Sequence, residues 1–377
     1  MKNSGITLGL CFVFSVLAVV ILYALSDKLT HKHNSFNRFF PPHPVIPVKE
    51  IDLNYNSYYF AGTDRDKVYL SNLTAPLHVL EVDLPSLDTI HITIQVENPK
   101  AITFSRNTRV SVLPPYFYIS DGIAPGLLRG RLGAWHARRF MYDSAYFSDA
   151  TPIGPKSFIL KTMSSTTREY VLGKETDKVP HVKLVPGLLE KQIDGIFCTD
   201  GMLHYNKDLS RLIYLYHYRN QYMVMDTSLN LLSYGKTIDT NSRAKIKTAS
   251  IPSQYSTTLS APGFMVNKDS YTSGELLFVH SDLMAKNESL ETFNKTSVID
   301  VYNIQDHTYK FSFYIYPYEE FKLNQFAVTD RHLIAIHHRH LLVYELHPKW
   351  FPDLQSQSAE VHLSGTHNNK KKDILSR

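Results

Sequence analysis

The sequence predicts an all-β protein, a six-bladed β-propeller that follows an N-terminal membrane-spanning helix. Three observations support this prediction: a composition rich in aromatic residues, a short phrase that recurs along the chain, and an uncharged apolar run near the N-terminus. The 377 residues include 24 Tyr and 20 Phe, and aromatic side chains fit the pleated, half-buried surface of a sheet. Because 43% of the residues are hydrophobic and 20% are charged, the chain can bury a core, which excludes a disordered protein.

Charge and cysteine content narrow the classes of partner and scaffold. Forty Lys and Arg against 35 Asp and Glu leave a net charge of only +5, spread along the chain. Recognition of nucleic acid through a basic stripe needs a stronger local charge, so we expect no nucleic-acid partner. The two cysteines are Cys198 and Cys11, which lies in the apolar run, so a disulfide scaffold is excluded.

Residues 6–25 (ITLGLCFVFSVLAVVILYAL) contain no charged side chain. Twenty helical residues at about 1.5 Å each span about 30 Å, the thickness of the hydrocarbon core of a bilayer. A cleaved signal peptide has a shorter apolar centre and a small-x-small cleavage site, and no such site follows Ala24. We therefore expect an uncleaved transmembrane signal anchor at 6–25, behind a short cytoplasmic tail at 1–5.

The flanks of this helix bear on its orientation. Lys2 precedes the helix, while Lys28, Lys32 and Arg38 follow it, so the positive-inside rule alone would place the body in the cytoplasm. Long domains cross the membrane largely regardless of charge, and a scarcity of cysteine suits an oxidising compartment. We therefore expect a single-pass protein of the cell (inner) membrane with its body on the periplasmic or extracellular side. Three N-glycosylation sequons are compatible with this location: Asn72, Asn287 and Asn294.

Composition predicts the boundaries of the stalk, the propeller domain and the C-terminal tail. The segment 26–47 ends in PPHPVIP, and prolines favour an extended, semi-rigid stalk. Residues 48–351 are expected to form the propeller domain. Residues 352–377 are polar and contain three consecutive lysines, which predicts a mobile polar tail.

A five-residue phrase recurs between residues 50 and 346, where no long stretch shows helical periodicity. The phrase is a large apolar residue, two further residues, then Ser or Thr, then Asp. Clear copies are FAGTD at 60, FYISD at 117, IFCTD at 196 and FAVTD at 326, and weaker copies are FILKT at 158 and FMVNK at 264. The copies start about 50 residues apart on average, close to the length of a four-stranded blade. We predict that each phrase is the inner strand of a blade and ends at a turn.

The fourth repeat gives the fullest prediction of a blade. Its strands are expected at 196–200, 212–218, 222–226 and 231–238, from the inner to the outer. A blade cannot bury both faces of its sheet alone, so neighbouring blades must stack, and the many Tyr and Phe are expected to fill the space between them. Residues 48–53 are expected to supply the outer strand of the last blade and so to close the ring, which leaves only short sheet edges exposed.

With these repeats the chain resembles six-bladed β-propellers of the TolB-like kind over residues 50–346. It is also similar to uncharacterised membrane-tethered propeller proteins of Gram-negative bacteria. The resemblance implies the fold and the tether, and it carries no functional residues. Two features depart from the pattern: GLLRGRLG stands at 126–133 where a clear strand is expected, and the repeat spacing is uneven. A ring of seven blades is therefore an alternative to six.

The recurring aspartates are the first candidate site. Asp64, Asp121, Asp200 and Asp330 end the four clear phrases, so they would lie at equivalent corners on one face of the ring. Carboxylates placed in this way could bind a cation or act as acid and base. The alternative is that each carboxylate caps its own turn, since a ring spreads equivalent corners apart.

The densest polar motif surrounds the fourth phrase. Asp194 and Asp200 each precede a glycine, and His204 follows, so the two aspartates would lie at opposite mouths of the central channel. Asp121, Asp194, Asp200 and His204 are therefore the weak candidates for catalysis. Asp-Gly is first of all a turn signal, and Cys198 between them is expected to be buried.

Histidines cluster near the C-terminus at His332, His337, His338, His340 and His347. Alternation along a strand sends His337 and His338 to opposite faces unless a turn lies between them. We expect such a turn at 338–340, so we predict no metal site there, and no cofactor motif occurs elsewhere.

The most cationic stretch of the body is the candidate for ligand binding. It contains Arg129, Arg131, Trp135, Arg138 and Arg139. Guanidinium groups interleaved with aromatic rings could meet an anionic ligand, a lipid headgroup or a protein partner. The alternative is a solvated, irregular insertion.

These observations favour a membrane-tethered, non-catalytic module that binds a protein or envelope ligand through the loops of a rigid ring. A first alternative is a propeller hydrolase or lyase that acts on saccharide or peptide with channel carboxylates. A further alternative, an accessory subunit of a membrane redox or transport complex, depends on the anchor and Cys198 alone.

Overall fold

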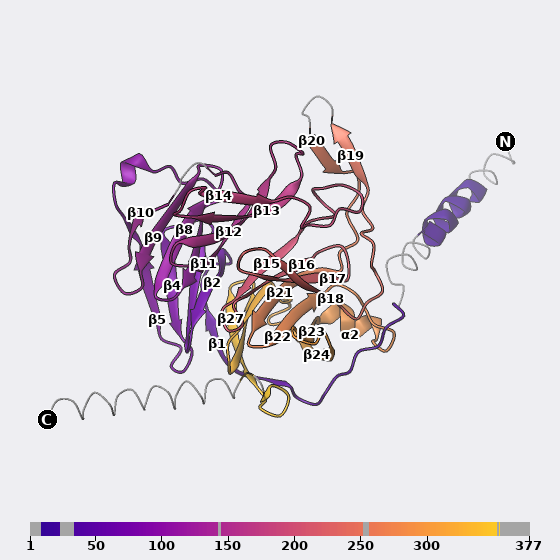
Figure 1. Cartoon of the computed structure of the whole chain (residues 1–377). Coiled ribbons are helices and arrows are strands. Elements are labelled where there is room, and N and C mark those ends of the chain that lie inside the picture. Colours follow the sequence, from indigo (N-terminus) through magenta and orange to yellow (C-terminus); the bar gives the residue numbers. More distant parts are fainter. Residues whose placement is uncertain (1–8, 23–33, 142–144, 252–255, 353, 355–377) are drawn as a thin grey trace.

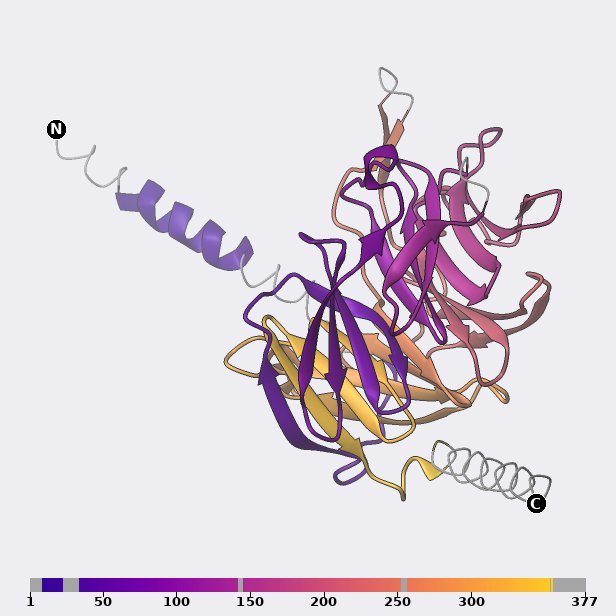
Figure 2. The ribbon, with the colours of Figure 1, turned by 90° about the vertical axis from the view of Figure 1, so that its left-hand side faces the viewer.

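The computed structural model describes residues 9–22, 34–141, 145–251, 256–352 and 354. Within these residues six sheets of four or five strands surround a common axis (Figure 1). Their innermost strands contact one another in the order β2, β7, β11, β15, β21 and β25, and β25 contacts β2 again. Figure 2 shows the indigo N-terminal blade beside the yellow C-terminal blade. The chain is therefore a closed six-bladed β-propeller.

The blades follow one another along the chain. Blade 1 holds β2 (Tyr58–Asp64), β3 (Lys67–Asn72), β4 (His78–Asp83) and β5 (Thr89–Thr93). Blade 2 holds β7 (Arg109–Leu113), β8 (Tyr116–Asp121), β9 (Gly126–Arg131) and β10 (His136–Arg139), with β6 (Gln95–Val96) beside β10. Blade 3 holds β11 (Asp149–Gly154), β12 (Ser157–Met163), β13 (Tyr170–Thr176) and β14 (Val182–Val185).

The second half of the ring is built in the same way. Blade 4 holds β15 (Gly201–Asn206), β16 (Arg211–Tyr216), β17 (Gln221–Asp226) and β18 (Leu231–Lys236), and a separate hairpin of β19 (Thr248–Ile251) and β20 (Ser256–Leu259) follows it. Blade 5 holds β21 (Asn267–Ser273), β22 (Leu276–Ser281), β23 (Ser297–Asn303) and β24 (Tyr309–Ile315). Blade 6 holds β25 (Gln325–Val328), β26 (His332–His337), β27 (His340–Leu346) and β1 (Val45–Asp52). The helical elements η1 (Pro99–Ala101) and α2 (Leu290–Lys295) are short.

Closure of the ring depends on the N-terminal strand. β1 pairs antiparallel with β27 from Val45 opposite Leu346 to Asp52 opposite His340. The last blade therefore takes its outer strand from residues nearly 300 positions away, as predicted for 48–53, and the strand begins three residues earlier than expected. This pairing ties the two ends of the ring together and removes an open edge.

The recurring phrase does not mark one strand position, which corrects the prediction. The copies at 60 and 326 lie in the inner strands β2 and β25, but those at 117 and 158 lie in the second strands β8 and β12. The copy at 196 is a loop before β15, and the copy at 264 reaches β21 only with its last two residues. Second strands are buried almost throughout, whereas inner strands alternate with half-exposed residues. In blades 2 and 3 the phrase therefore marks the almost fully buried second strand, because the inner strand faces the channel.

Other strand predictions have mixed outcomes. In blade 4 the second, third and outer strands are confirmed, and only the inner strand is wrong. The stretch 126–133 is not a departure from the fold, because β9 occupies most of it. Gly130 is needed there, since a Cβ atom would lie 2.4 Å from the Phe117 ring and from the His136 carbonyl oxygen.

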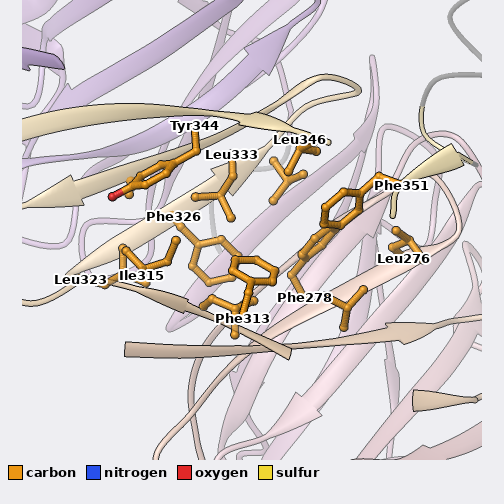
Figure 3. Packing of buried hydrophobic residues seen from close by; sticks show 14 of the residues in the cluster. Leu276, Phe278, Phe313, Ile315, Leu323, Phe326, Leu333, Tyr344, Leu346 and Phe351 are labelled. Carbon is orange, nitrogen blue, oxygen red and sulfur yellow. The ribbon is translucent and has the colours of Figure 1, made fainter. Parts of the chain in front are cut away.

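Aromatic side chains fill the space between the blades, as predicted. Between blades 5 and 6, Phe278, Phe313 and Phe326 are at most 3% exposed and face one another across the two sheets (Figure 3). Phe351, from the segment after β27, is fully buried and stacks on Phe278 with ring centroids 5.9 Å apart. Fully burying a side chain of this size contributes about 1.5–3 kcal/mol, so the residues after the last strand help to hold the two blades together.

The N-terminal segment has two described parts. Residues 9–22 are helical, with large apolar side chains that are mostly exposed. No helix in the described part of the chain is long and apolar enough to cross a membrane, and the ends of the predicted span 6–25 lie outside the described residues. From residue 34 onward, part of the predicted stalk lies against blade 5, where the buried Arg38 donates to Asp300 at 2.7 and 3.0 Å and also pairs with Glu288.

Candidate ligand-binding site in the central channel

The inner strands give the channel two distinct mouths. The C-terminal ends of β2, β7, β15, β21 and β25 meet around one pocket. We call this end of the channel the second mouth and the opposite end, where these strands begin, the first mouth. The pocket has a volume of about 170 Å³, enough for one amino-acid side chain or another group of that size.

The pocket walls combine apolar and hydroxyl-bearing side chains. Val112 and Val328 are buried, and their side chains form part of the apolar wall. Tyr271 on β21 is hydrogen-bonded to Thr63 on β2, and its burial raises the pKa of the phenol above its ordinary value. Tyr205 from β15 completes the polar side. Residues from blades 1, 2, 4, 5 and 6 thus converge on one small volume, as expected for a pocket that holds a ligand by a few placed polar groups.

Four charged side chains stand at the pocket rim: Arg65, Lys207, Asp208 and Asp330. All four are exposed and lie in the turns that follow inner strands. Asp208 accepts one hydrogen bond, from the Gly274 N–H at 2.9 Å. Within the described residues, the side chains of Arg65, Lys207 and Asp330 have neither a hydrogen bond nor an ion pair. These groups therefore retain their full capacity to bind a ligand.

The negative charge of Asp208 acts on Asp330 from the far side of blade 5. The pKa of Asp330 is raised, first by partial burial and then by the negative charge of Asp208. Lys207 acts in the opposite direction but does not cancel these effects. The rim therefore carries an electrostatic cost in the unliganded protein that a bound cation would relieve.

Asp121, by contrast, is fully engaged. It ends β8 at the first mouth, and its carboxylate accepts from Thr108 Oγ1 at 2.6 Å, Ser105 N at 2.6 Å and Ala124 N at 2.9 Å, among others. These bonds outweigh its burial and lower its pKa. Asp121 and Asp200 lie at the first mouth and Asp64 and Asp330 at the second, so the four recurring aspartates do not share one face, as the pattern had suggested.

Asp194 is likewise a turn residue. Its carboxylate accepts from the backbone N–H groups of Ile196 at 2.8 Å and Phe197 at 2.5 Å. Cys198, in the same loop, is 1% exposed, and its sulfur accepts from the N–H of Gln192 at 3.2 Å. Asp194 and Asp200 both precede β15 and lie on the first-mouth side, not at opposite mouths, because the inner strand begins after them.

Asp200 and His204 each have a different interaction partner. Asp200 pairs with the buried Lys161 of blade 3. His204 lies on β15, where its Nε2 is 2.7 Å from Ser270 Oγ, and burial lowers its pKa to about 4. Four residues along an extended strand span about 13 Å. The structure therefore does not bring the predicted carboxylates and His204 into one constellation.

The basic aromatic segment spreads over three surfaces of blade 2. Arg129 lies 4.7 Å from the Tyr116 ring centroid and 4.6 Å from that of Phe140, on the side of blade 3. Trp135 stacks on Phe117 with centroids 4.9 Å apart, on the side of blade 1. Arg131, Arg138 and Arg139 are exposed on β9 and β10. The side chains follow a strand edge and do not converge on one pocket.

The C-terminal histidines are held by the protein itself. A turn is present at 338–339, one residue shorter than the predicted 338–340, because His340 already pairs with His337 as the first residue of β27. His338 stacks on Phe321 with centroids 4.3 Å apart, and His340 Nε2 lies 3.1 Å from a Glu319 carboxylate oxygen. In the part of the chain that the structure describes, no group of three or more His, Cys, Asp and Glu side chains could hold a metal ion.

The rim residues Arg65, Lys207 and Asp208 did not stand out in the sequence. One signal could have found two of the rim positions: Thr-Asp-Arg occurs at 63–65 and again at 329–331. These are the two copies of the phrase that do lie on inner strands, so both triplets arrive at the second mouth. The turn that carries Lys207 and Asp208 has no counterpart of this kind.

No protein-family model and no curated protein matches the chain. Among solved structures, a member of the DUF4221 family from Bacteroides vulgatus is similar over 83% of this chain and 98% of its own, with 14% identity and a TM-score of 0.49. A catalytically inactive virginiamycin B lyase from Staphylococcus aureus with quinupristin is similar over 82% of this chain and 98% of its own, with 11% identity and a TM-score of 0.43. The predicted six-bladed propeller is confirmed by the sheets of this chain, and the narrower TolB-like assignment stays a prediction.

Proposed function

We propose that this protein is a non-catalytic binding module whose ligand, a protein or a component of the cell envelope, occupies the second mouth of the channel. One observation carries the proposal: loops of five blades converge on a pocket of about 170 Å³ whose rim charges Arg65, Lys207 and Asp330 have no partner among the described residues. Buried or ion-paired charges elsewhere already have partners within the protein, whereas the fold places these three groups around a pocket without a partner.

A charge reversal at the rim tests this proposal. Affinity capture from the membranes of the source cells would compare the natural chain with Asp330→Lys and with the control Asp88→Lys. Asp88 is an exposed carboxylate between β4 and β5 and does not line the pocket. We expect the same ligand with the natural chain and the control, and its loss with Asp330→Lys. Equal recovery from all three proteins would refute the proposal.

We also propose that residues 6–25 tether the module to the cell membrane, with the propeller on the periplasmic or extracellular side. The segment has no charge over 20 residues, and the apolar side chains of its described helical part, such as Phe12 and Phe14, are more than 70% exposed. Exposed apolar surface of this kind needs a covering. The proposal predicts that the full chain stays with membranes through an alkaline wash, whereas a Val13→Glu/Leu17→Glu variant is released. Release of both proteins would contradict the tether.

A further inference from the structure

The rim of the second mouth carries charged side chains of both signs around one pocket. Arg65 comes from blade 1, Lys207 and Asp208 from blade 4, and Asp330 from blade 6. A rim of a single sign would attract any ion of the opposite sign. A balanced rim gives no such general attraction, and it favours a ligand that presents a cation and an anion together.

The acidic side of the rim is suited to an ammonium group. Asp208 has one oxygen committed to the Gly274 N–H, and Asp330 has no hydrogen bond or ion pair in the described chain. A cation seated near both carboxylates would relieve the repulsion that they exert on each other. Hydrogen bonds between charged groups are about twice as strong as neutral ones, so an ammonium group would be preferred to a hydroxyl here.

The basic side of the rim is suited to a carboxylate. Arg65 and Lys207 both line the pocket, and neither guanidinium nor ammonium is used by another described residue. The hydroxyls of Thr272 and Thr329, which could otherwise bind a polyol, are already hydrogen-bonded within the protein. Among the described side chains that line the pocket, those left without a hydrogen bond are the charged Arg65, Lys207 and Asp330 and the hydroxyls of Tyr205 and Ser273.

We propose that the pocket binds a zwitterion of amino-acid size, with its ammonium group at Asp208 and Asp330 and its carboxylate at Arg65 and Lys207. A volume of about 170 Å³ is enough for a small free amino acid or one end of a short peptide. The apolar wall of Val112 and Val328 then contacts the side chain of the ligand. This inference rests on the proposed binding function of the same pocket, and it adds the chemical class of the ligand.

Calorimetric titration of the purified full chain tests the inference with defined probes. Alanine and dialanine should both bind. The ratio of their affinities shows whether the pocket prefers a free amino acid or a short peptide. N-acetylalanine, which lacks the ammonium group, and alaninamide, which lacks the carboxylate, should each bind about 10- to 100-fold more weakly, because each loses a charge-assisted hydrogen bond. Glucose, a neutral polyol of similar size, should not bind.

Variants assign each end of the ligand. Asp330→Asn should weaken alanine binding about tenfold or more and leave the binding of N-acetylalanine unaffected, because that probe has no ammonium group. Arg65→Gln should also weaken alanine binding, and it should leave the binding of alaninamide, which has no carboxylate, unaffected. Asp88→Asn, on the outer rim of blade 1, should change neither affinity. Thermal melts that match the natural chain would show that the variants are folded.

Two results would overturn the inference. One is equal affinity for blocked and unblocked alanine, or tighter binding of glucose than of either. The other is no binding of any zwitterion while Asp330→Lys still abolishes capture of the native ligand, in which case the pocket binds something else and the proposed function stands. If no zwitterion binds and Asp330→Lys still captures the native ligand, both the inference and the proposed function are wrong.

Discussion

The two mouths of the channel use their charged residues differently. At the first mouth, Asp121 is surrounded by N–H and O–H donors and Asp200 pairs with Lys161 of the neighbouring blade. At the second mouth, Asp330 and Arg65 line a pocket and have no hydrogen bond or ion pair with other described residues. Acidic residues therefore stabilise the fold at one end and remain available to a ligand at the other.

The comparison shows that a dense polar motif in a sequence is a poor guide to a binding site. The stretch 190–204 holds the most acidic, thiol and imidazole groups in a short space. In the structure Asp194, Asp200 and Cys198 accept hydrogen bonds from backbone N–H groups in and beside the loop before β15, and His204 lies on β15 against Ser270. A polar group that the fold already uses has little left to offer a ligand, because a new partner must first replace the old one.

The largest predicted effect concerns the charges that fasten the N-terminal segment on the first-mouth side. Arg38→Ala would leave Asp300 and Glu288 buried without their cation. Removing one partner of a buried pair costs about 3–5 kcal/mol, so the free energy of unfolding measured in urea should fall by about that amount. Lys286→Ala, at an exposed position beside the same segment, should change it by less than about 0.5 kcal/mol. Equal effects of the two variants would show that Arg38 is not structural.

A second, smaller effect compares one aspartate from each mouth. Asp121→Ala leaves the backbone N–H groups of Ser105, Ile123 and Ala124 without their carboxylate acceptor, which should cost about 2–3 kcal/mol of unfolding free energy. Asp330→Ala removes no hydrogen bond, so its cost should stay within about 0.5 kcal/mol. Chemical denaturation of both variants gives the difference directly. A reversed order would mean that the second mouth is the more tightly structured end.

Asp269 on β21 should give an effect that depends on pH. Burial raises its pKa from 3.8 to about 7, so the folded state holds a proton that the unfolded state has lost. The stability contributed by this group is present below pH 3.8 and is lost as the pH rises to about 7. The stability of the natural chain relative to Asp269→Asn should fall over this window in urea titrations at several pH values. A difference that does not vary with pH would contradict the burial of Asp269.

His204 on β15 should show the opposite slope. Burial lowers its pKa from 6.5 to about 4, so the folded state excludes a proton that the unfolded state binds. Stability should therefore rise with pH between about 4 and 6.5 in the natural chain relative to His204→Gln. A difference that does not vary with pH would place the imidazole in contact with bulk water.

The positions of most strands could be predicted from local sequence. The runs 212–218, 222–226 and 231–238 became β16, β17 and β18 because each alternates or concentrates apolar side chains between turn residues. The closing strand was also predictable, since 48–53 is an isolated strand-like segment before the first repeat. The basic segment with Arg129 and Trp135 was identified as cationic, but its side chains diverge to different faces of blade 2.

The sequence by itself determined that the chain is all-β, how its strands and turns alternate, and that an uncharged apolar segment precedes them, because these properties depend on residues close together along the chain. Only the tertiary structure decided which strand of each blade lines the channel and which charges are paired. Lys161 meets Asp200, Arg38 meets Asp300, and Asp330 meets no partner in the described chain because of how separate blades pack in space. No local pattern encodes that packing, since the groups it joins or leaves apart can lie more than 200 residues from one another.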